Sequence, residues 1–378
     1  MRKRYIIALL AVLTAAVGCR REEPVLPPEE EQHGDSVQNA IAGFYLLNEG
    51  NMGSNKATLD YYDYTTATYR RNIYAEANPN VPKELGDVGN DLQIYGSRLY
   101  AVINCSNKIE VMDARTAARI GQVDIPNCRY LAFDGPYAYV SSYAGPVSLD
   151  ASHAQIGYVA RIDTATLQVT ATCNVGYQPD GLAIADGKLF VANSGGYMSP
   201  GYDSTVSVID LTSFQELTRI SVDINLHHVR ADRHGQLWVS SRGDYYDHPS
   251  RLFCIDRHTL TVTDTIPFAV SDLDIAGDSL YFFGSEFSYI TMRDEQTFGL
   301  VDLRTHEVLS SALITDATRD SLTHPYCIKV NPLTRELLLT DAKDYVTPGT
   351  LRCYGPDGRQ KWAVRTGDIP AHIAFDTK

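Results

Sequence analysis

Histidine and aspartate side chains recur at one position of a short apolar strand that the chain repeats. When the copies are aligned on their apolar residues, this position holds Asp91, Tyr130, Gly181, His228, Asp272, Cys327 and His372. Imidazole nitrogens and carboxylate oxygens transfer protons and bind metals such as zinc. If the copies surround one axis, a metal or acid–base centre there is one interpretation. The other is structural, because polar side chains and water commonly line such channels.

Tyrosine gathers in the loops that follow a second repeated strand. These loops carry Tyr143, Tyr197, Tyr202, Tyr245, Tyr246, Tyr289 and Tyr345, with Asn51, Asn193 and Arg242 in or beside them. A tyrosine offers a rigid apolar face and a hydroxyl, and it loses little conformational entropy on ordering. This composition favours recognition of a large amphipathic ligand or of a protein. Tyrosines that merely cap strand ends are the alternative interpretation.

Both sets are expected on one face of the fold, where they define a candidate ligand site. The residue before the aligned position is also polar or aromatic in most copies, as in Arg129, Asp180 and Tyr326. The candidate ligand-binding residues are Asn51, Asp91, Arg129, Tyr130, Tyr143, Asp180, Asn193, Tyr197, His228, Arg242, Tyr245, Tyr246, Asp272, Tyr289, Tyr326, Tyr345 and His372. The sequence shows no glycine-rich phosphate loop, nucleophile elbow or paired-carboxylate motif. We therefore predict a binding protein with no catalytic residue, cofactor or resident metal.

The elements that position these residues are marked by an apolar run followed by Asp, two residues and Thr or Ser. The aspartates of its six copies are Asp63, Asp113, Asp163, Asp210, Asp256 and Asp302, which lie 46 to 50 residues apart. Short strands rich in aromatic and β-branched residues lie between them. A period of roughly 40–50 residues with such strands is typical of β-propeller blades. The aspartate is predicted to close a turn between the third and fourth strands by accepting backbone N–H bonds.

The ends of the repeat predict an all-β, closed ring of seven blades over residues 42–378. Five blades begin near residues 91, 128, 179, 227 and 271, and a sixth begins at residue 324. Segment 371–375 has the pattern of a first strand, but the other strands of its blade are missing. The three strands that start at residues 44–48 have the opposite defect, because they lack a first strand. Pairing the two fragments completes a seventh blade and leaves no free sheet edge.

Residues 1–18 have the pattern of a lipoprotein signal peptide. A basic start at residues 2–4 precedes an apolar stretch that is too short for a comfortable membrane span. The stretch ends in AVGC at residues 16–19, which is similar to a bacterial lipobox, and lipidation of Cys19 would anchor the domain to a membrane. An ordinary signal peptide is the alternative. Residues 19–41 are rich in Glu and Pro and are predicted to form a disordered, extended tether.

Charge and cysteine content restrict the class of partner. The formal net charge is −13 at pH 7 and no basic stripe is present, so we expect no binding to nucleic acid. The six cysteines other than Cys19 form no C-x-x-C zinc pattern. In an exported domain a disulfide between Cys105 and Cys128 is possible, since both are expected on one face. Burial as small apolar side chains is the alternative.

The repeat resembles the bacterial YncE-like, YVTN-repeat propellers. Residues 178–184 (QPDGLAI), 189–193 (LFVAN) and 205–210 (TVSVID) carry this resemblance, which covers about residues 42–378. The opening segment 44–55 (FYLLNEGNMGSN), together with the lipoprotein start, resembles the BtuG-type surface lipoproteins of gut Bacteroides. That resemblance implies a lipid-anchored protein on the outer surface of the outer membrane. It also implies capture of cobalamin (vitamin B12) and delivery to a BtuB-like, TonB-dependent outer-membrane transporter.

Three functions remain open at this level. The favoured one is binding of cobalamin or a related corrinoid, as a transported ligand rather than a cofactor. The second is a surface propeller that binds a protein or a glycan. The third is a propeller enzyme such as a metal-dependent lyase or lactonase, which would need a His, Glu and metal cluster at the channel mouth. The candidates for such a cluster are His228 and His372, with His227 and His324 beside them.

Overall fold

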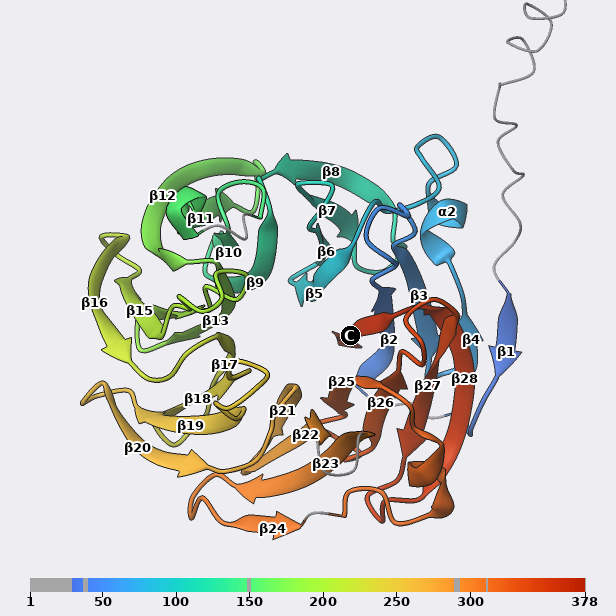
Figure 1. Ribbon diagram of the computed structural model, residues 1–378. Coiled ribbons are helices and arrows are strands. Elements are labelled where there is room, and N and C mark those ends of the chain that lie inside the picture. The colour runs from blue at the N-terminus through green and yellow to red at the C-terminus, as the bar shows by residue number, and fades with distance from the viewer. Residues whose placement is uncertain (1–28, 37–39, 148–150, 289–292, 311, 378) are drawn as a thin grey trace, which may run out of the picture.

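Seven antiparallel sheets surround a central axis in the computed structural model, which describes residues 29–36, 40–147, 151–288, 293–310 and 312–377 (Figure 1). Each sheet is one blade, and neighbouring blades follow one another around the ring. This arrangement confirms the predicted seven-bladed β-propeller. The first blade contains, from its outer edge to the axis, β1 (Glu30–Gln32), β4 (Thr68–Arg70), β3 (Thr58–Asp63), β2 (Ile41–Asn48) and β29 (Pro370–Thr377).

The other six blades each contain four consecutive strands, which follow one another from the axis outward. Blades 2 and 3 are β5 (Gly89–Tyr95), β6 (Arg98–Ile103), β7 (Lys108–Asp113), β8 (Arg119–Asp124) and β9 (Cys128–Asp134), β10 (Tyr137–Ser142), β11 (Ile156–Asp163), β12 (Gln168–Tyr177). Blades 4 and 5 are β13 (Pro179–Ala185), β14 (Lys188–Asn193), β15 (Thr205–Asp210), β16 (Gln215–Ser221) and β17 (Leu226–Ala231), β18 (Gln236–Ser241), β19 (Arg251–Asp256), β20 (Thr261–Ile266). Blades 6 and 7 are β21 (Asp272–Ala276), β22 (Ser279–Ser288), β23 (Arg293–Asp302), β24 (Val308–Ser310) and β25 (Pro325–Val330), β26 (Leu337–Asp341), β27 (Pro348–Tyr354), β28 (Gln360–Asp368).

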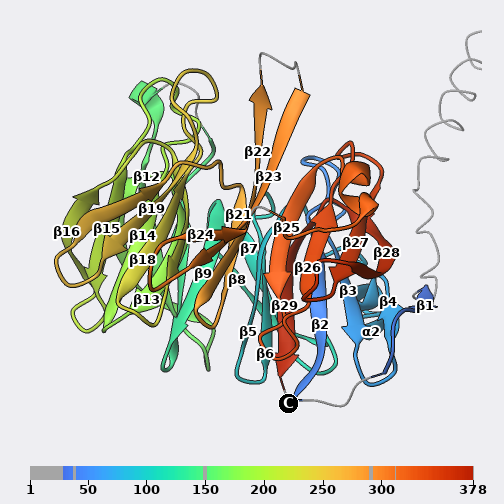
Figure 2. The ribbon, with the colours of Figure 1, turned by 90° about the horizontal axis from the view of Figure 1, so that it is seen from below.

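The ring is closed by the C-terminal strand, as the sequence predicts. Strand β29 pairs antiparallel with β2, with Phe375 opposite Phe44 and Ile373 opposite Leu46. The C-terminal end of the chain therefore lies beside the start of β2 (Figures 1 and 2). Segments more than three hundred residues apart in the chain thus share one sheet, and the inner edge of β2 is covered.

The predicted tether at residues 19–41 is wrong for residues 30–32. These residues form β1, which pairs with β4 at the outer edge of blade 1 (Figure 1). Arg71 forms ion pairs with Glu29 and Glu31, so the acidic composition that suggested disorder instead supplies partners for a basic side chain. Cys19 and the rest of residues 19–28 lie outside the described residues.

Helical structure is limited to short connections. The described residues contain the helix α2 (Ile73–Ala77) and two 3₁₀ turns at Ala151–His153 and Ala317–Ser321. In this part of the chain, we find no helix with the length and apolar character needed to span a membrane.

The repeated aspartate closes the outer hairpin of its blade, which confirms its predicted role. In blade 3, Asp163 Oδ1 accepts bonds from the backbone N of Ala165 at 3.0 Å and of Thr166 at 2.8 Å, and from the Thr166 hydroxyl at 3.0 Å. The residue four positions after each aspartate has positive φ and is never glycine: Ala67, Ala117, Leu167, Phe214, Leu260 and His306. The left-handed backbone is unfavourable for these residues, so the side-chain bonds hold each turn in place.

Apolar side chains fill the spaces between blades. Between blades 7 and 1, Tyr62 stacks on Trp362 with ring centroids 4.9 Å apart, and Phe44 stacks on Tyr62 at 5.2 Å. Ile373 of the closing strand belongs to the same buried cluster. Because each blade packs against the blade on either side, the innermost strands are held in a ring whose inward side chains face a channel.

Candidate functional site

A cavity of about 1190 Å³ runs along the propeller axis and is lined by the innermost strands. Eleven of the predicted site residues line it: Asp91, Arg129, Tyr130, His228, Arg242, Tyr245, Tyr246, Asp272, Tyr326, Tyr345 and His372. These eleven residues come from first strands and from loops, and the two groups occupy different parts of the cavity. The residues on first strands and Arg242 form the wall, whereas the tyrosines on loops form the rim at one end, which we call the mouth.

Three tyrosines at the mouth expose their rings to solvent. Tyr246 is 77% exposed, Tyr245 63% and Tyr345 39%, and all three line the cavity. Tyr245 and Tyr345 both have positive φ, in loops that aspartate side chains hold by accepting backbone N–H bonds from the following residues. Aromatic rings carried on such turns above a polar cavity are suited to cover the apolar faces of a large ligand.

Strands β22 and β23 reach beyond the strands of the neighbouring blades on the mouth side (Figure 2). Its ladder continues to the pair Ser288 and Arg293. Tyr289, which the sequence placed among the ligand-binding residues, lies outside the described residues.

One buried carboxylate joins two arginines of the cavity wall. Asp180 on β13 lies 3.2 Å from Arg129 Nε on β9 and 3.1 Å from an Arg242 terminal nitrogen in the loop after β18. Tyr143 donates its hydroxyl to the same carboxylate at 2.7 Å, and the Arg129 guanidinium lies over the Tyr143 ring at 4.8 Å. Asp180 is fully buried and does not line the cavity, whereas Arg129 and Arg242 both do. Blades 3 and 5 therefore contribute two arginines to the cavity, and blade 4 contributes the buried carboxylate that both of them share.

Aromatic rings from three blades meet farther along the channel. The Tyr130 hydroxyl lies 2.8 Å from His227 Nε2, and the Tyr130 ring contacts the edges of His228 and His372 with centroids 5.9 and 6.5 Å away. His227 and His228 are 3.7 Å apart between ring centroids. Burial lowers the pKa of all three histidines, that of His372 to about 3. These imidazoles are neutral near pH 7 and act as hydrogen-bonding groups rather than as cations.

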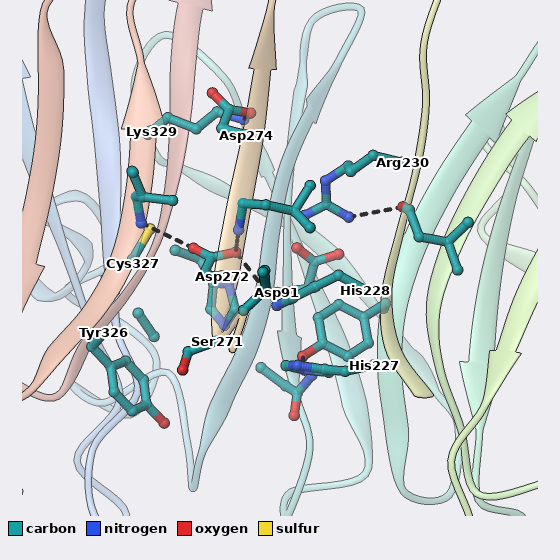
Figure 3. Close-up of a pocket in the computed structure, with 18 of the residues that line it drawn as sticks. Asp91, His227, His228, Arg230, Ser271, Asp272, Asp274, Tyr326, Cys327 and Lys329 are labelled. Atoms are coloured by element: carbon teal, nitrogen blue, oxygen red, sulfur yellow. Dashed lines mark hydrogen bonds and ion pairs between the residues drawn. The ribbon is translucent and has the colours of Figure 1, made fainter. Parts of the chain in front are cut away.

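Two candidate carboxylates connect neighbouring blades. Asp91 on β5 accepts a bond from the backbone N of Leu131 on β9 at 2.8 Å, and Asp272 on β21 accepts one from Ile328 on β25 at 2.9 Å. Burial raises the pKa of both groups, that of Asp272 to about 6. His228 Nε2 lies 3.4 Å from Asp272 (Figure 3). Their positions at the wall are thus explained by strand-to-strand bonds, as the structural interpretation of the aligned position expects.

The glycine at the aligned position of blade 4 also has a structural explanation. A Cβ on Gly181 would lie 2.6 Å from the carbonyl oxygen of His227 and 2.9 Å from the backbone N of Val229. Strands β13 and β17 therefore approach too closely there for any side chain.

The cavity contains charged residues that the sequence reasoning missed. Arg230, Asp274 and Lys329 line it, and Lys329 Nζ lies 2.8 Å from Asp274 (Figure 3). Each is two positions after an aligned residue, and alternate residues of a strand share a face. Extending the alignment by two residues would have found them.

Glu49 is a further residue that the candidate set omitted. It follows β2 within the segment that resembles the surface lipoproteins, and it lines the cavity. Tyr326 donates its hydroxyl to Glu49 at 2.7 Å. Burial raises the pKa of Glu49 to about 7, so the group carries only part of a negative charge near neutral pH.

Several predicted site residues do not line the cavity. Asn193 is fully buried and is bonded to Gly176, Thr205 and Ser207, which is a structural role within blade 4. Tyr197 is 47% exposed on a loop outside the cavity. Asn51 lies in a turn where its carbonyl accepts a bond from Ser54. Tyr143 and Asp180 act from behind the wall, as described above.

The described residues show neither a metal cluster nor a disulfide. Within these ranges, no group of three His, Cys, Asp or Glu side chains has the arrangement to hold a metal ion. Cys105 and Cys128 are both free thiols, and Cys128 is buried with its thiol directed at the Lys108 carbonyl. The disulfide that the sequence allows between them is therefore not formed in this structure.

Known structures share this architecture at low sequence identity. A hydrazine synthase of Kuenenia stuttgartiensis matches with a TM-score of 0.61 and 14% identity, covering 76% of this chain and 89% of that one. A quinoprotein alcohol dehydrogenase-like protein of Bacteroides thetaiotaomicron matches with a TM-score of 0.61 and 15% identity, covering 90% and 79%. The computationally designed protein Ika8 matches at 0.54 and 12%, covering 92% and 97%. At these identities the likeness concerns the fold alone.

Sequence comparison gives the family. None of the curated proteins compared with the chain matches it. A family model described as a domain of unknown function, DUF5074, matches residues 42–348, which is most of the propeller. The chain belongs to the DUF5074 family.

Proposed function

We propose that this propeller is a cell-surface lipoprotein that binds cobalamin or a related corrinoid and passes it to a TonB-dependent outer-membrane transporter. The observation that carries the proposal is the axial cavity of about 1190 Å³ with its rim of three exposed tyrosines. A cavity of this size is at or above the upper end of the usual range for small-molecule sites, roughly 300–1,000 Å³, so it suits a large ligand. The sequence resemblance to corrinoid-capturing lipoproteins supplies the ligand class.

The chemistry of the wall supports a ligand with many amide groups. A corrin ring is broad and carries amide side chains on its edge, each with donors and an acceptor. The cavity offers the Glu49 carboxyl and the Tyr326 hydroxyl near the mouth, and the imidazoles of His227, His228 and His372 farther along. The tyrosine rings can cover the apolar face of the ring while these groups bond its edge.

Replacement of Tyr246 with Ala tests the binding site. We expect cyanocobalamin affinity to fall by about 1–3 kcal/mol, because one aromatic contact among several is lost. Isothermal titration calorimetry of the purified domain with cyanocobalamin measures this change. The turn variant Asp210→Ala is the control: its aspartate accepts bonds from Ser213 at the opposite end of blade 4, so stability should fall while affinity stays the same.

The calorimetry also separates this proposal from its main alternative. Absence of heat with both cyanocobalamin and cobinamide would reject a corrinoid ligand. A protein or glycan partner would then be the better proposal for the same tyrosine rim.

Replacement of Cys19 with Ala tests the lipid anchor. We expect the variant to leave the membrane fraction and appear in the soluble fraction, because the acyl chains at this residue supply the attachment. Fractionation with protease accessibility of whole cells measures it, with Cys105→Ala as the control for loss of a thiol. Retention of the Cys19 variant in the membrane would argue against the anchor.

A further inference from the structure

We propose that the Arg129–Asp180–Arg242 cluster is an anion subsite at the channel mouth, which takes a phosphate or carboxylate group of the bound small molecule. The inference rests on the proposed function for the identity of the whole ligand. It rests on the geometry of three adjacent blades for the anion.

The first argument is the charge that the wall presents. Two arginines, Arg129 and Arg242, line the cavity, and the carboxylate that joins their guanidinium groups belongs to Asp180, which is fully buried and does not line the cavity. The single carboxylate of Asp180 is thus shared by two guanidinium groups, and it also accepts a hydrogen bond from the Tyr143 hydroxyl. The cavity surface of the cluster is therefore cationic, although the chain as a whole has a net charge of −13.

The second argument is that the two guanidinium groups are held in place before a ligand arrives. Asp180 bonds Arg129 through Nε and Arg242 through one terminal nitrogen, so other N–H groups of both side chains remain to bond a ligand. The Tyr143 ring supports the Arg129 guanidinium from one face. Guanidinium groups fixed in this way match the paired oxygens of phosphate or carboxylate.

The third argument concerns the acidic groups that line the cavity at the mouth. Glu49 is a carboxyl of the cavity wall there, and Tyr326 already donates a hydrogen bond to it. Its pKa of about 7 leaves it partly protonated at neutral pH. Glu49 interacts electrostatically with Arg129, and its partial charge offsets only part of the positive charge of the arginine cluster.

The test compares ligands with and without the anionic group. Cyanocobalamin carries a phosphodiester in its nucleotide arm, and dicyanocobinamide lacks that arm. In Arg242→Gln, we expect cyanocobalamin affinity to fall by about 10- to 100-fold and dicyanocobinamide affinity to stay within about twofold of the wild type. Arg242→Lys should keep part of the cyanocobalamin affinity, because it retains the charge but not the planar fork.

Inorganic phosphate alone supplies a readout that does not need a corrinoid. At constant ionic strength, replacing chloride with phosphate should raise the melting temperature of the wild type and not that of Arg242→Gln. Arg233→Gln is the matched control, since this 61% exposed arginine lies in the β17–β18 turn at the opposite end of blade 5. Arg242→Gln should fold, because Asp180 keeps its bonds to Arg129 and Tyr143.

The outcomes distinguish the anion subsite from the proposed function. A phosphate effect that depends on Arg242, in a protein that binds no corrinoid, would support the subsite and reject cobalamin. Equal cyanocobalamin binding by the wild type and Arg242→Gln, with no phosphate effect in either, would overturn the subsite and leave corrinoid binding standing.

Discussion

Deletion of residues 370–378 should lower the melting temperature by more than about 10 °C or abolish cooperative unfolding. The deletion removes β29, exposes the edge of β2 and takes the buried Ile373 and Ala374 out of two core clusters. Burial of one such aliphatic side chain contributes about 1.5–3 kcal/mol, and several ladder bonds and the Thr340–Pro370 bond are lost with it. Circular dichroism or calorimetric melting measures the change.

A peptide added in trans separates loss of the strand from general damage. A synthetic peptide of residues 369–378 should bind the exposed edge of β2 in the truncated protein and recover part of the melting temperature. Removal of residue 378 alone is the control and should leave stability unchanged. If the truncated protein melts at the same temperature as the full chain, the closing strand does not stabilise the ring.

Replacement of Asp180 with Ala should destabilise the domain by about 3–5 kcal/mol. The fully buried carboxylate joins Arg129, Arg242 and the Tyr143 hydroxyl, so its loss leaves two guanidinium groups close together without their shared anion. Chemical denaturation monitored by fluorescence gives the free energy of unfolding directly.

A surface aspartate provides the comparison for this prediction. Asp278 also contacts two basic side chains, Arg233 and His234, but it does so at the surface, where solvent screens the charges. Asp278→Ala should therefore change the midpoint of denaturation very little. Similar midpoints for the two variants would mean that the Asp180 cluster is not a structural unit of the cavity wall.

Sequence patterns were sufficient for the architecture, because a propeller repeats local information along the chain. The spacing of Asp63, Asp113 and the later copies marks each blade, and the turn needs only residues that lie within four positions of one another. The closing strand at 371–375 was found as the missing member of an incomplete blade. The exception was β1, where an acidic segment gains order only through contacts with Arg71.

The blade count, the closing strand, the turns and the group of first-strand residues that surround the axis therefore all follow from patterns along the chain. Which side chains meet in the cavity depends instead on the assembled fold. Asp180 contacts residues 51 and 62 positions away on the two neighbouring blades, and Tyr130 reaches His227 across 97. Tyr197 and Tyr246 belong to the same type of loop, yet only Tyr246 lines the cavity. Such contacts depend on how the blades are arranged about the axis and on how each loop folds. No local pattern along the chain determines that arrangement or those loop conformations.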